Sequence, residues 1–128
     1  MDRLVVIVDD DKDLLDMLIF SFEAEGFLVK GLENKTKAME FLMNKEILQQ
    51  ISLLILDRLL PDGDGLDILK ELQTIMPKQI PVLFLSVLSS ERDVLTGLKH
   101  GAIDYVAKPF SLPVLLTKAL GLINRETG

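Results

Sequence analysis

The stretch from Leu53 to Gly65, LLILDRLLPDGDG, decides the fold of this 128-residue chain. Four apolar residues lead directly to a carboxylate, Asp57, and a turn rich in aspartate and glycine follows Pro61. A short apolar run without strict alternation is typical of a strand buried on both faces of a parallel sheet. Such a strand would hold Asp57 rigidly at its carboxyl end, and the turn behind it would leave room for a ligand.

Similar apolar runs recur along the chain, at Leu4–Val8, Phe27–Val29, Val82–Leu85 and Ile103–Ala107. The segments between them have apolar residues at helical spacing, as in the stripe of Leu14, Leu18 and Phe22. Ser90 with Asp93 has the spacing of a capping box, and Ser111 is expected to cap the last helix. Five strands therefore alternate with five helices, which predicts a doubly wound α/β sheet with helices on both faces.

The composition is that of one globular domain, with 48% hydrophobic and 27% charged residues. We expect the domain to span residues 1–124 and residues 125–128 to form a tail or the start of a linker. No apolar run is long enough for a membrane helix, and acidic residues interrupt the start of the chain too early for a signal peptide. The chain has no cysteine, so a cytoplasmic location is the default expectation. A formal net charge of -6 argues against direct nucleic-acid binding.

Charged and polar residues follow four of the predicted strands. The first strand ends at Asp9 and Asp10, the third at Asp57, the fourth at Ser86, and the fifth leads to Lys108. Because ligands of open parallel sheets bind at the carboxyl ends of the strands, we expect these side chains to meet at one edge. Clustered carboxylates repel one another unless a cation joins them, and hard oxygen ligands favour Mg²⁺. In this arrangement Asp57 is either a third metal ligand or a nucleophile that forms an acyl phosphate.

Other polar residues have simpler interpretations. Asp11 precedes the first helical stripe and is predicted to be its N-cap. Residues 62–65, DGDG, are interpreted as turn chemistry. His100 falls near a helix end and is assigned no role.

Four motifs in order, VDDD, LDRLLPDGDG, LS and YVAKPF, resemble those of the receiver domain of bacterial two-component response regulators, including the single-domain chemotaxis type. The resemblance extends from Leu4 to about Ile123. It implies a flavodoxin-like sheet with the strand order 2-1-3-4-5. It also implies a phosphoacceptor at Asp57 and a cis bond between Lys108 and Pro109.

The resemblance assigns the remaining roles by position. Asp9 and Asp10 match the acidic pair that holds Mg²⁺, helped by Asp57 and by the backbone carbonyl of Leu59. Ser86 and Lys108 match the hydroxyl switch residue and the invariant lysine, and Tyr105 matches the switch aromatic. Two positions that flank the site and are associated with the rate of dephosphorylation are apolar here, Leu59 and Leu88, and Val87 stands where many relatives have a smaller residue.

The implied function is a phosphorylation-activated signalling switch and not a conventional enzyme. A histidine kinase or phosphotransfer protein would phosphorylate Asp57 with Mg²⁺, and the first helix would dock the kinase. The surface of the helix after Ser90, the strand Ile103–Ala107 and the helix after Ser111 would then change, and it could also form a homodimer. A DNA-binding or enzymatic output domain would follow Gly128 if the chain is part of a longer regulator.

Two alternatives stand beside this interpretation. A degenerate receiver could act only as a protein-interaction module, although such a module would need none of Asp10, Asp57, Ser86 and Lys108. A phosphatase of the haloacid-dehalogenase type also begins from an aspartate after an apolar strand. That class requires a second aspartate two residues later, where this chain has Leu59.

Overall fold

The computed structural model describes residues 3–127 and contains the predicted five-stranded parallel sheet. Its strands are β1 (Leu4–Val8), β2 (Leu28–Leu32), β3 (Ile51–Leu56), β6 (Val82–Ser86) and β7 (Asp104–Ala107). The sheet order is β2-β1-β3-β6-β7, and every pairing is parallel. In chain order these are the second, first, third, fourth and fifth strands, so the predicted fold and strand order are confirmed.

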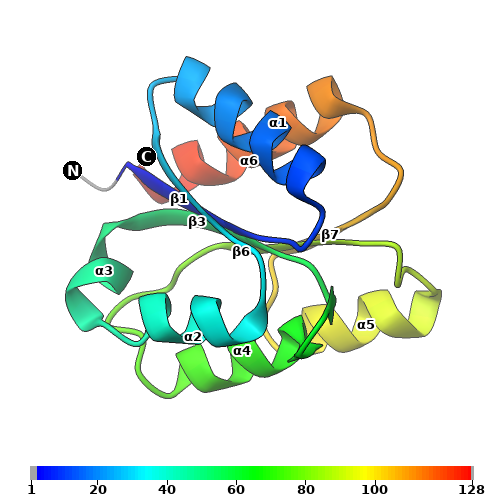
Figure 1. Cartoon of the computed structure of the whole chain (residues 1–128). Helices are drawn as coiled ribbons and strands as arrows, with labels where there is room; N and C mark the ends of the chain where they lie inside the picture. Colours follow the sequence, from blue (N-terminus) through cyan, green and yellow to red (C-terminus); the bar gives the residue numbers. More distant parts are fainter. Residues whose placement is uncertain (1–2, 128) are drawn as a thin grey trace.

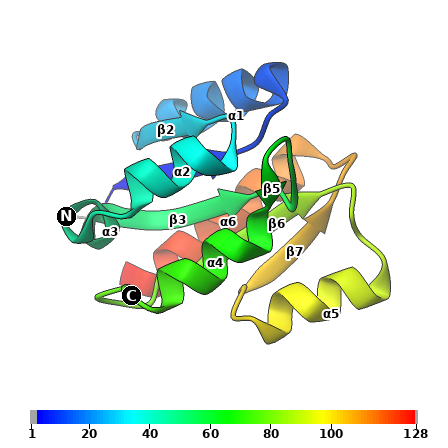
Figure 2. The same cartoon turned by 60° about the horizontal axis from the view of Figure 1, so that its bottom comes forward.

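Helices cover both faces of the sheet, as Figures 1 and 2 show. The helices α1 (Lys12–Ala24) and α6 (Leu112–Thr127) lie on one face, whereas α2 (Lys35–Leu42), α4 (Gly65–Gln73) and α5 (Glu91–Lys99) lie on the other. The described residues contain a sixth helix, α3 (Lys45–Gln50), so the expected number of five was wrong. The Asn44 side chain accepts hydrogen bonds from the amides of Glu46 and Ile47, and this cap starts a helix too short for a clear apolar period.

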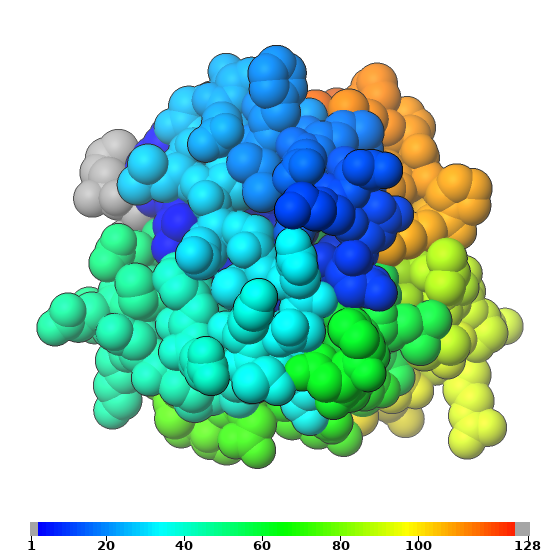
Figure 3. Space-filling view, in the orientation of Figure 1, coloured from blue at the N-terminus to red at the C-terminus, as the bar shows by residue number. Residues whose placement is uncertain are grey.

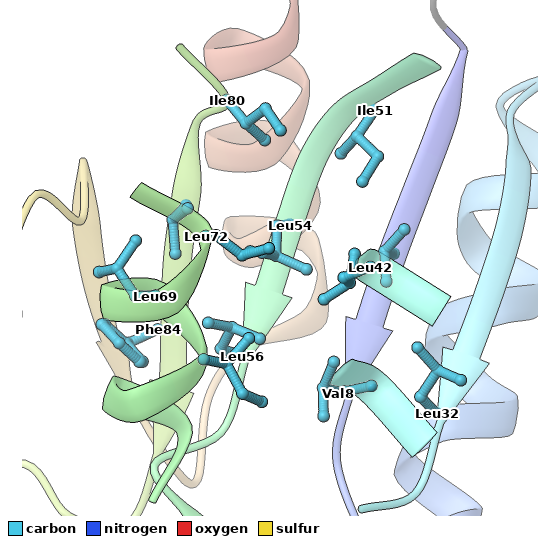
Figure 4. Close-up of a cluster of buried hydrophobic side chains, with 14 of the residues drawn as sticks. Val8, Leu32, Leu42, Ile51, Leu54, Leu56, Leu69, Leu72, Ile80 and Phe84 are labelled. Atoms are coloured by element: carbon cyan, nitrogen blue, oxygen red, sulfur yellow. The ribbon is translucent and has the colours of Figure 1, made fainter. Parts of the chain in front are cut away.

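The core consists of two apolar layers, one on each face of the sheet. The alternation of side chains along β3 sends Leu54 and Leu56 toward α2 and α4, and Leu53 and Ile55 toward α1 and α6. Figure 4 shows the first layer, in which Leu54, Leu56 and Phe84 pack against residues of α2 and α4. All six residues of β3 are buried. The strand that delivers Asp57 is therefore the rigid centre of the fold.

The predicted helix caps are confirmed. The Asp11 carboxylate accepts a hydrogen bond from the Leu14 amide at the start of α1, and Ser90 with Asp93 forms a capping box at α5. Strand β2 runs further than expected, because Lys30 and Gly31 interrupt the apolar run without ending the strand. Helix α6 continues through positions 125–127, and Gly128 lies outside the described residues.

Within residues 3–127, no helix has both the length and the apolar content that crossing a membrane requires.

Candidate functional site

The register of the central strands places two of the predicted site residues side by side. Val8 of β1 pairs with Leu56 of β3, so Asp9 and Asp57 follow neighbouring strands at the same level. The Asp57 amide donates to the Val8 carbonyl at 3.0 Å, so the backbone hydrogen bonds between β1 and β3 continue as far as Asp57. Asp9 and Asp57 are only 2% and 4% exposed. The sheet therefore fixes two buried carboxylates next to each other.

Lys108 joins these two carboxylates. Its Nζ atom lies 2.7 Å from Oδ2 of Asp9 and 2.8 Å from Oδ2 of Asp57. The Lys108 amide donates to the carbonyl of Ser86, and the bond between Lys108 and Pro109 is cis as expected. The backbone hydrogen bond to Ser86 holds Lys108 at the carboxyl end of β6.

The charges in this cluster do not balance. Burial raises the pKa of Asp9, although the hydrogen bond from Lys108 acts in the opposite direction. Burial also acts to lower the pKa of Lys108, but its hydrogen bonds to Asp57 and Asp9 outweigh that effect and leave the pKa raised. One ammonium thus faces more than one buried carboxylate, and a further positive charge would stabilise the cluster.

Asp10 completes a group that suits a divalent cation. Oxygen atoms of Asp9, Asp10 and Asp57 all lie within 4.8 Å of one another, and Asp10 is exposed while the other two are buried. Three hard oxygen donors, one of them on an exposed residue, suit Mg²⁺, which keeps several water ligands. The Leu59 amide donates to Oδ1 of Asp57 at 2.9 Å, so the backbone at Leu59 is also adjacent to the cluster.

Ser86 and Tyr105 lie on β6, which is next to β3, and on β7, which is next to β6. Ser86 is fully buried at the end of β6, and its hydroxyl accepts a hydrogen bond from the Leu88 amide at 3.2 Å. Tyr105 of β7 is half-buried, stacks on Phe84 with ring centroids 5.5 Å apart, and donates from its hydroxyl to the Leu88 carbonyl. Leu88 is therefore held at its amide by Ser86 and at its carbonyl by Tyr105.

Sequence reasoning missed Arg58. This side chain is 7% exposed and makes a bidentate ion pair with Asp64, with N–O distances of 2.7 and 2.9 Å. The pair raises the pKa of Arg58 and, against the effect of burial, lowers the pKa of Asp64. The available signal was a positive charge directly after Asp57, inside the otherwise apolar run LLILDRLL.

The turn after Pro61 does more than reverse the chain. Asp64 is the N-cap of α4 and accepts a hydrogen bond from the Leu66 amide. The carboxylate of Asp62 accepts hydrogen bonds from the amide of Lys35, and from both the amide and the hydroxyl of Thr36. These bonds tie the antiparallel hairpin of β4 (Leu59–Leu60) and β5 (Gly63–Asp64) to the start of α2.

We expect the Asp62 carboxyl to titrate with a pKa of about 2, below its ordinary value of 3.8, chiefly because of the Thr36 hydroxyl. A lowered folded pKa means that this contact contributes stability above pH 3.8, and that the contribution is lost as the pH falls through about 2. Carboxyl carbon NMR should show the pKa rising toward its ordinary value in Thr36→Val and staying low in Thr36→Ser. Equal pKa values in all three proteins would exclude the hydroxyl as the cause.

A shallow groove borders the carboxylate cluster. Its lining includes Leu14 and Met17 of α1, and Val87 and Phe110 from the loops after β6 and β7. In the space-filling view, the dark blue start of α1 lies beside the orange segment that precedes α6 (Figure 3). An approaching molecule that reached Asp57 would meet this apolar border.

Comparisons with known proteins agree with this geometry. The sequence pattern of the response regulator receiver domain matches residues 5–120. A probable transcriptional regulatory protein of Picosynechococcus sp. is 35% identical over 95% of this chain, which spans about half the length (49%) of that relative.

Solved structures show the same fold. The receiver domain of the Francisella response regulator 1452 has a TM-score of 0.84 with 29% identity, covering 97% of this chain and 98% of the other. The activated DrrB receiver domain with BeF3 has a TM-score of 0.81 with 30% identity, covering 97% and 99%. The non-phosphorylated HemR receiver domain from Leptospira biflexa has a TM-score of 0.84 with 27% identity, covering 94% of both chains.

The fold and the carboxylate cluster define a receiver domain of two-component signalling. The chain belongs to the response regulator receiver domain family.

Proposed function

We propose that this receiver is a working phosphorylation switch that accepts a phosphoryl group on Asp57. The observation that supports this most directly is the position of Lys108, whose ammonium contacts both Asp9 and Asp57. A structural ion pair would need one carboxylate, whereas this site gathers three at the open end of a rigid strand. The donor is a phosphohistidine of a histidine kinase or phosphotransfer protein, and we place the exchange in the cytoplasm. The domain is not a conventional enzyme, because it modifies itself.

The transfer is an in-line displacement. One oxygen of the Asp57 carboxylate forms a bond to phosphorus while the bond from phosphorus to the donor histidine nitrogen breaks, and that nitrogen retains the electron pair. Lys108 stays beside Asp57 and stabilises the negative charge on the transferring oxygens. A bound Mg²⁺, held by Asp9, Asp10, Asp57 and the backbone carbonyl of Leu59, would supply further charge stabilisation.

The phosphoryl oxygens then compete for the hydroxyl of Ser86. If the hydroxyl turns toward them, the Leu88 amide loses its present acceptor, and the loop between β6 and α5 is released at that end. Tyr105 contacts the same loop through the Leu88 carbonyl. We expect the face formed by α5, β7 and α6 to change in consequence, and this face serves an output partner, a second copy or an attached domain. The likeness to a transcriptional regulatory protein makes transcription one candidate output.

Phosphoryl uptake by the purified protein tests the proposal. Incubation with acetyl phosphate and Mg²⁺ should add the mass of one phosphoryl group to the intact protein. The gain should disappear when a chelator removes the metal, because the carboxylates then face the incoming phosphoryl group without a divalent cation. No gain in the presence of Mg²⁺ would support a module that only binds other proteins.

We also expect slow loss of the phosphoryl group. Leu59, which is 49% exposed, and Leu88 offer no polar side chain to orient an attacking water. In a phosphate-release time course, Leu59→Asn combined with Leu88→Glu should release phosphate about tenfold faster or more than the wild type. Leu59→Ala combined with Leu88→Ala is the matched control and should not gain that rate. Equal rates in all three proteins would show that these positions do not limit hydrolysis.

A further inference from the structure

Arg58 has a donor group that its ion pair with Asp64 does not use. Nε and Nη2 contact the two oxygens of Asp64. The third nitrogen, Nη1, is buried and meets no hydrogen-bond acceptor at normal distance and angle among the described residues. A buried charged donor without an acceptor is costly, so its surroundings indicate what it is placed to bind.

The surroundings of this guanidinium lead to Tyr105. The Cζ atom of Arg58 lies 6.0 Å from the centroid of the Phe84 ring, and Phe84 stacks in turn on Tyr105. The positive charge of Arg58 lies close enough to Tyr105 to lower the pKa of its hydroxyl, although burial has the larger effect and leaves that pKa raised. The two side chains thus share one half-buried space on the α4 and α5 side of the sheet.

The chemistry of the two groups is complementary. The hydroxyl of Tyr105 has one proton, which it donates to the Leu88 carbonyl, so its oxygen can still accept. Nη1 of Arg58 can only donate. Gly97 provides the room for this arrangement, because a Cβ atom at that position would lie 3.0 Å from the Tyr105 ring.

We propose that Arg58 is a positioning residue for Tyr105: a small movement brings its Nη1 within hydrogen-bond distance of the tyrosine hydroxyl oxygen, and the guanidinium then holds the ring inside the domain. Asp64 orients the guanidinium for this contact by accepting from its other two nitrogens. The inference rests on the proposed function in one respect, which is that Tyr105 takes part in the switch. It extends that function, because Arg58 would favour the inward position of Tyr105 before any phosphoryl group is present.

The chain suits a direct test, because it contains one tyrosine and no tryptophan. The tyrosine ring NMR signals and the tyrosine fluorescence therefore report on Tyr105 alone. In Arg58→Met we expect the ring signals to shift toward those of free tyrosine, and a neutral quencher to reach the ring more readily. Arg58→Lys keeps the positive charge, so its Tyr105 ring signals should lie between those of the wild type and those of Arg58→Met.

Arg3→Met is the matched control for the loss of an arginine. Arg3 lies before β1, 4.4 Å from the centroid of the Phe27 ring, and makes no contact with Tyr105. Its substitution should leave the Tyr105 signals unchanged. If Arg58→Met leaves them unchanged as well, the proposal is wrong.

Two further measurements keep the test decisive. If Arg58→Met does not fold, Tyr105→Phe removes the acceptor instead, and the NMR signals of the Arg58 guanidinium should change; unchanged signals would overturn the proposal. Phosphoryl uptake from acetyl phosphate separates this inference from the proposed function. Arg58→Met should gain one phosphoryl group like the wild type, whereas absence of uptake in both proteins contradicts the switch and leaves the Tyr105 result standing.

Discussion

Asp57→Asn should take up no phosphoryl group from acetyl phosphate under conditions in which the wild type takes up one. The amide has nearly the shape of the carboxylate, and its oxygen can still accept the hydrogen bond from the Leu59 amide. Its nitrogen and oxygen lack the nucleophilic charge that the transfer requires. Lys108 also keeps its ion pair with Asp9, so the rest of the site stays assembled. Intact-mass measurement detects the complete loss directly.

Asp67→Asn is the matched control for this substitution. Asp67 is an exposed acid on α4 and pairs with Lys35 at 3.3 Å, away from the carboxylate cluster. This variant should gain one phosphoryl group at the wild-type level. If Asp57→Asn gains the mass while its fold is intact, another carboxylate is the acceptor, and Asp10, the exposed member of the cluster, becomes the residue to replace next.

The sequence predicted the strand ends well because two simple rules determine them. Apolar runs of Val, Ile and Leu mark strands buried on both faces, and the carboxyl ends of parallel strands share one edge of the sheet. The juxtaposition of Asp9, Asp57 and Lys108 follows from these rules without any knowledge of side-chain contacts. The additional helix α3 does not, because six residues give fewer than two turns in which to recognise a helical period.

Contacts across the turn after Asp57 were less predictable. Aspartate and glycine between apolar segments indicate a turn, and this holds for residues 62–65. The pattern does not reveal that Asp62 binds the start of α2, or that Asp64 pairs with a buried arginine. The start of α2 is distant from Asp62 in the sequence, and the arginine that pairs with Asp64 points into the domain. Only the packing of α2, α4 and the hairpin brings these partners together. The need for glycine at position 65 also depends on this packing, because the start of α4 lies against the backbone of Asp57.

Gly65→Ala should destabilise the domain by about 3 kcal/mol or more, because the new methyl group has no space. A Cβ atom at position 65 would lie 1.9 Å from the carbonyl oxygen of Asp57 and 2.9 Å from its carbonyl carbon. Both are backbone atoms, so no side-chain rotation relieves the clash. The Gly65 amide also donates to the Arg58 carbonyl at 2.9 Å, and a shift of the chain would weaken that bond. Urea unfolding measures the loss.

Gly121→Ala provides the opposite result from the same chemical change. Position 121 is exposed on α6, and a Cβ atom there would meet nothing within 4 Å. Alanine should therefore stabilise the domain by about 0.5–1 kcal/mol through its higher helix propensity. Because Gly65 is in contact with the backbone of Asp57, the remaining folded fraction of Gly65→Ala should also take up phosphoryl groups more slowly than Gly121→Ala. Equal stability of the two variants would mean that the turn after Asp57 can move aside, and that the phosphoacceptor is not held by close packing against α4.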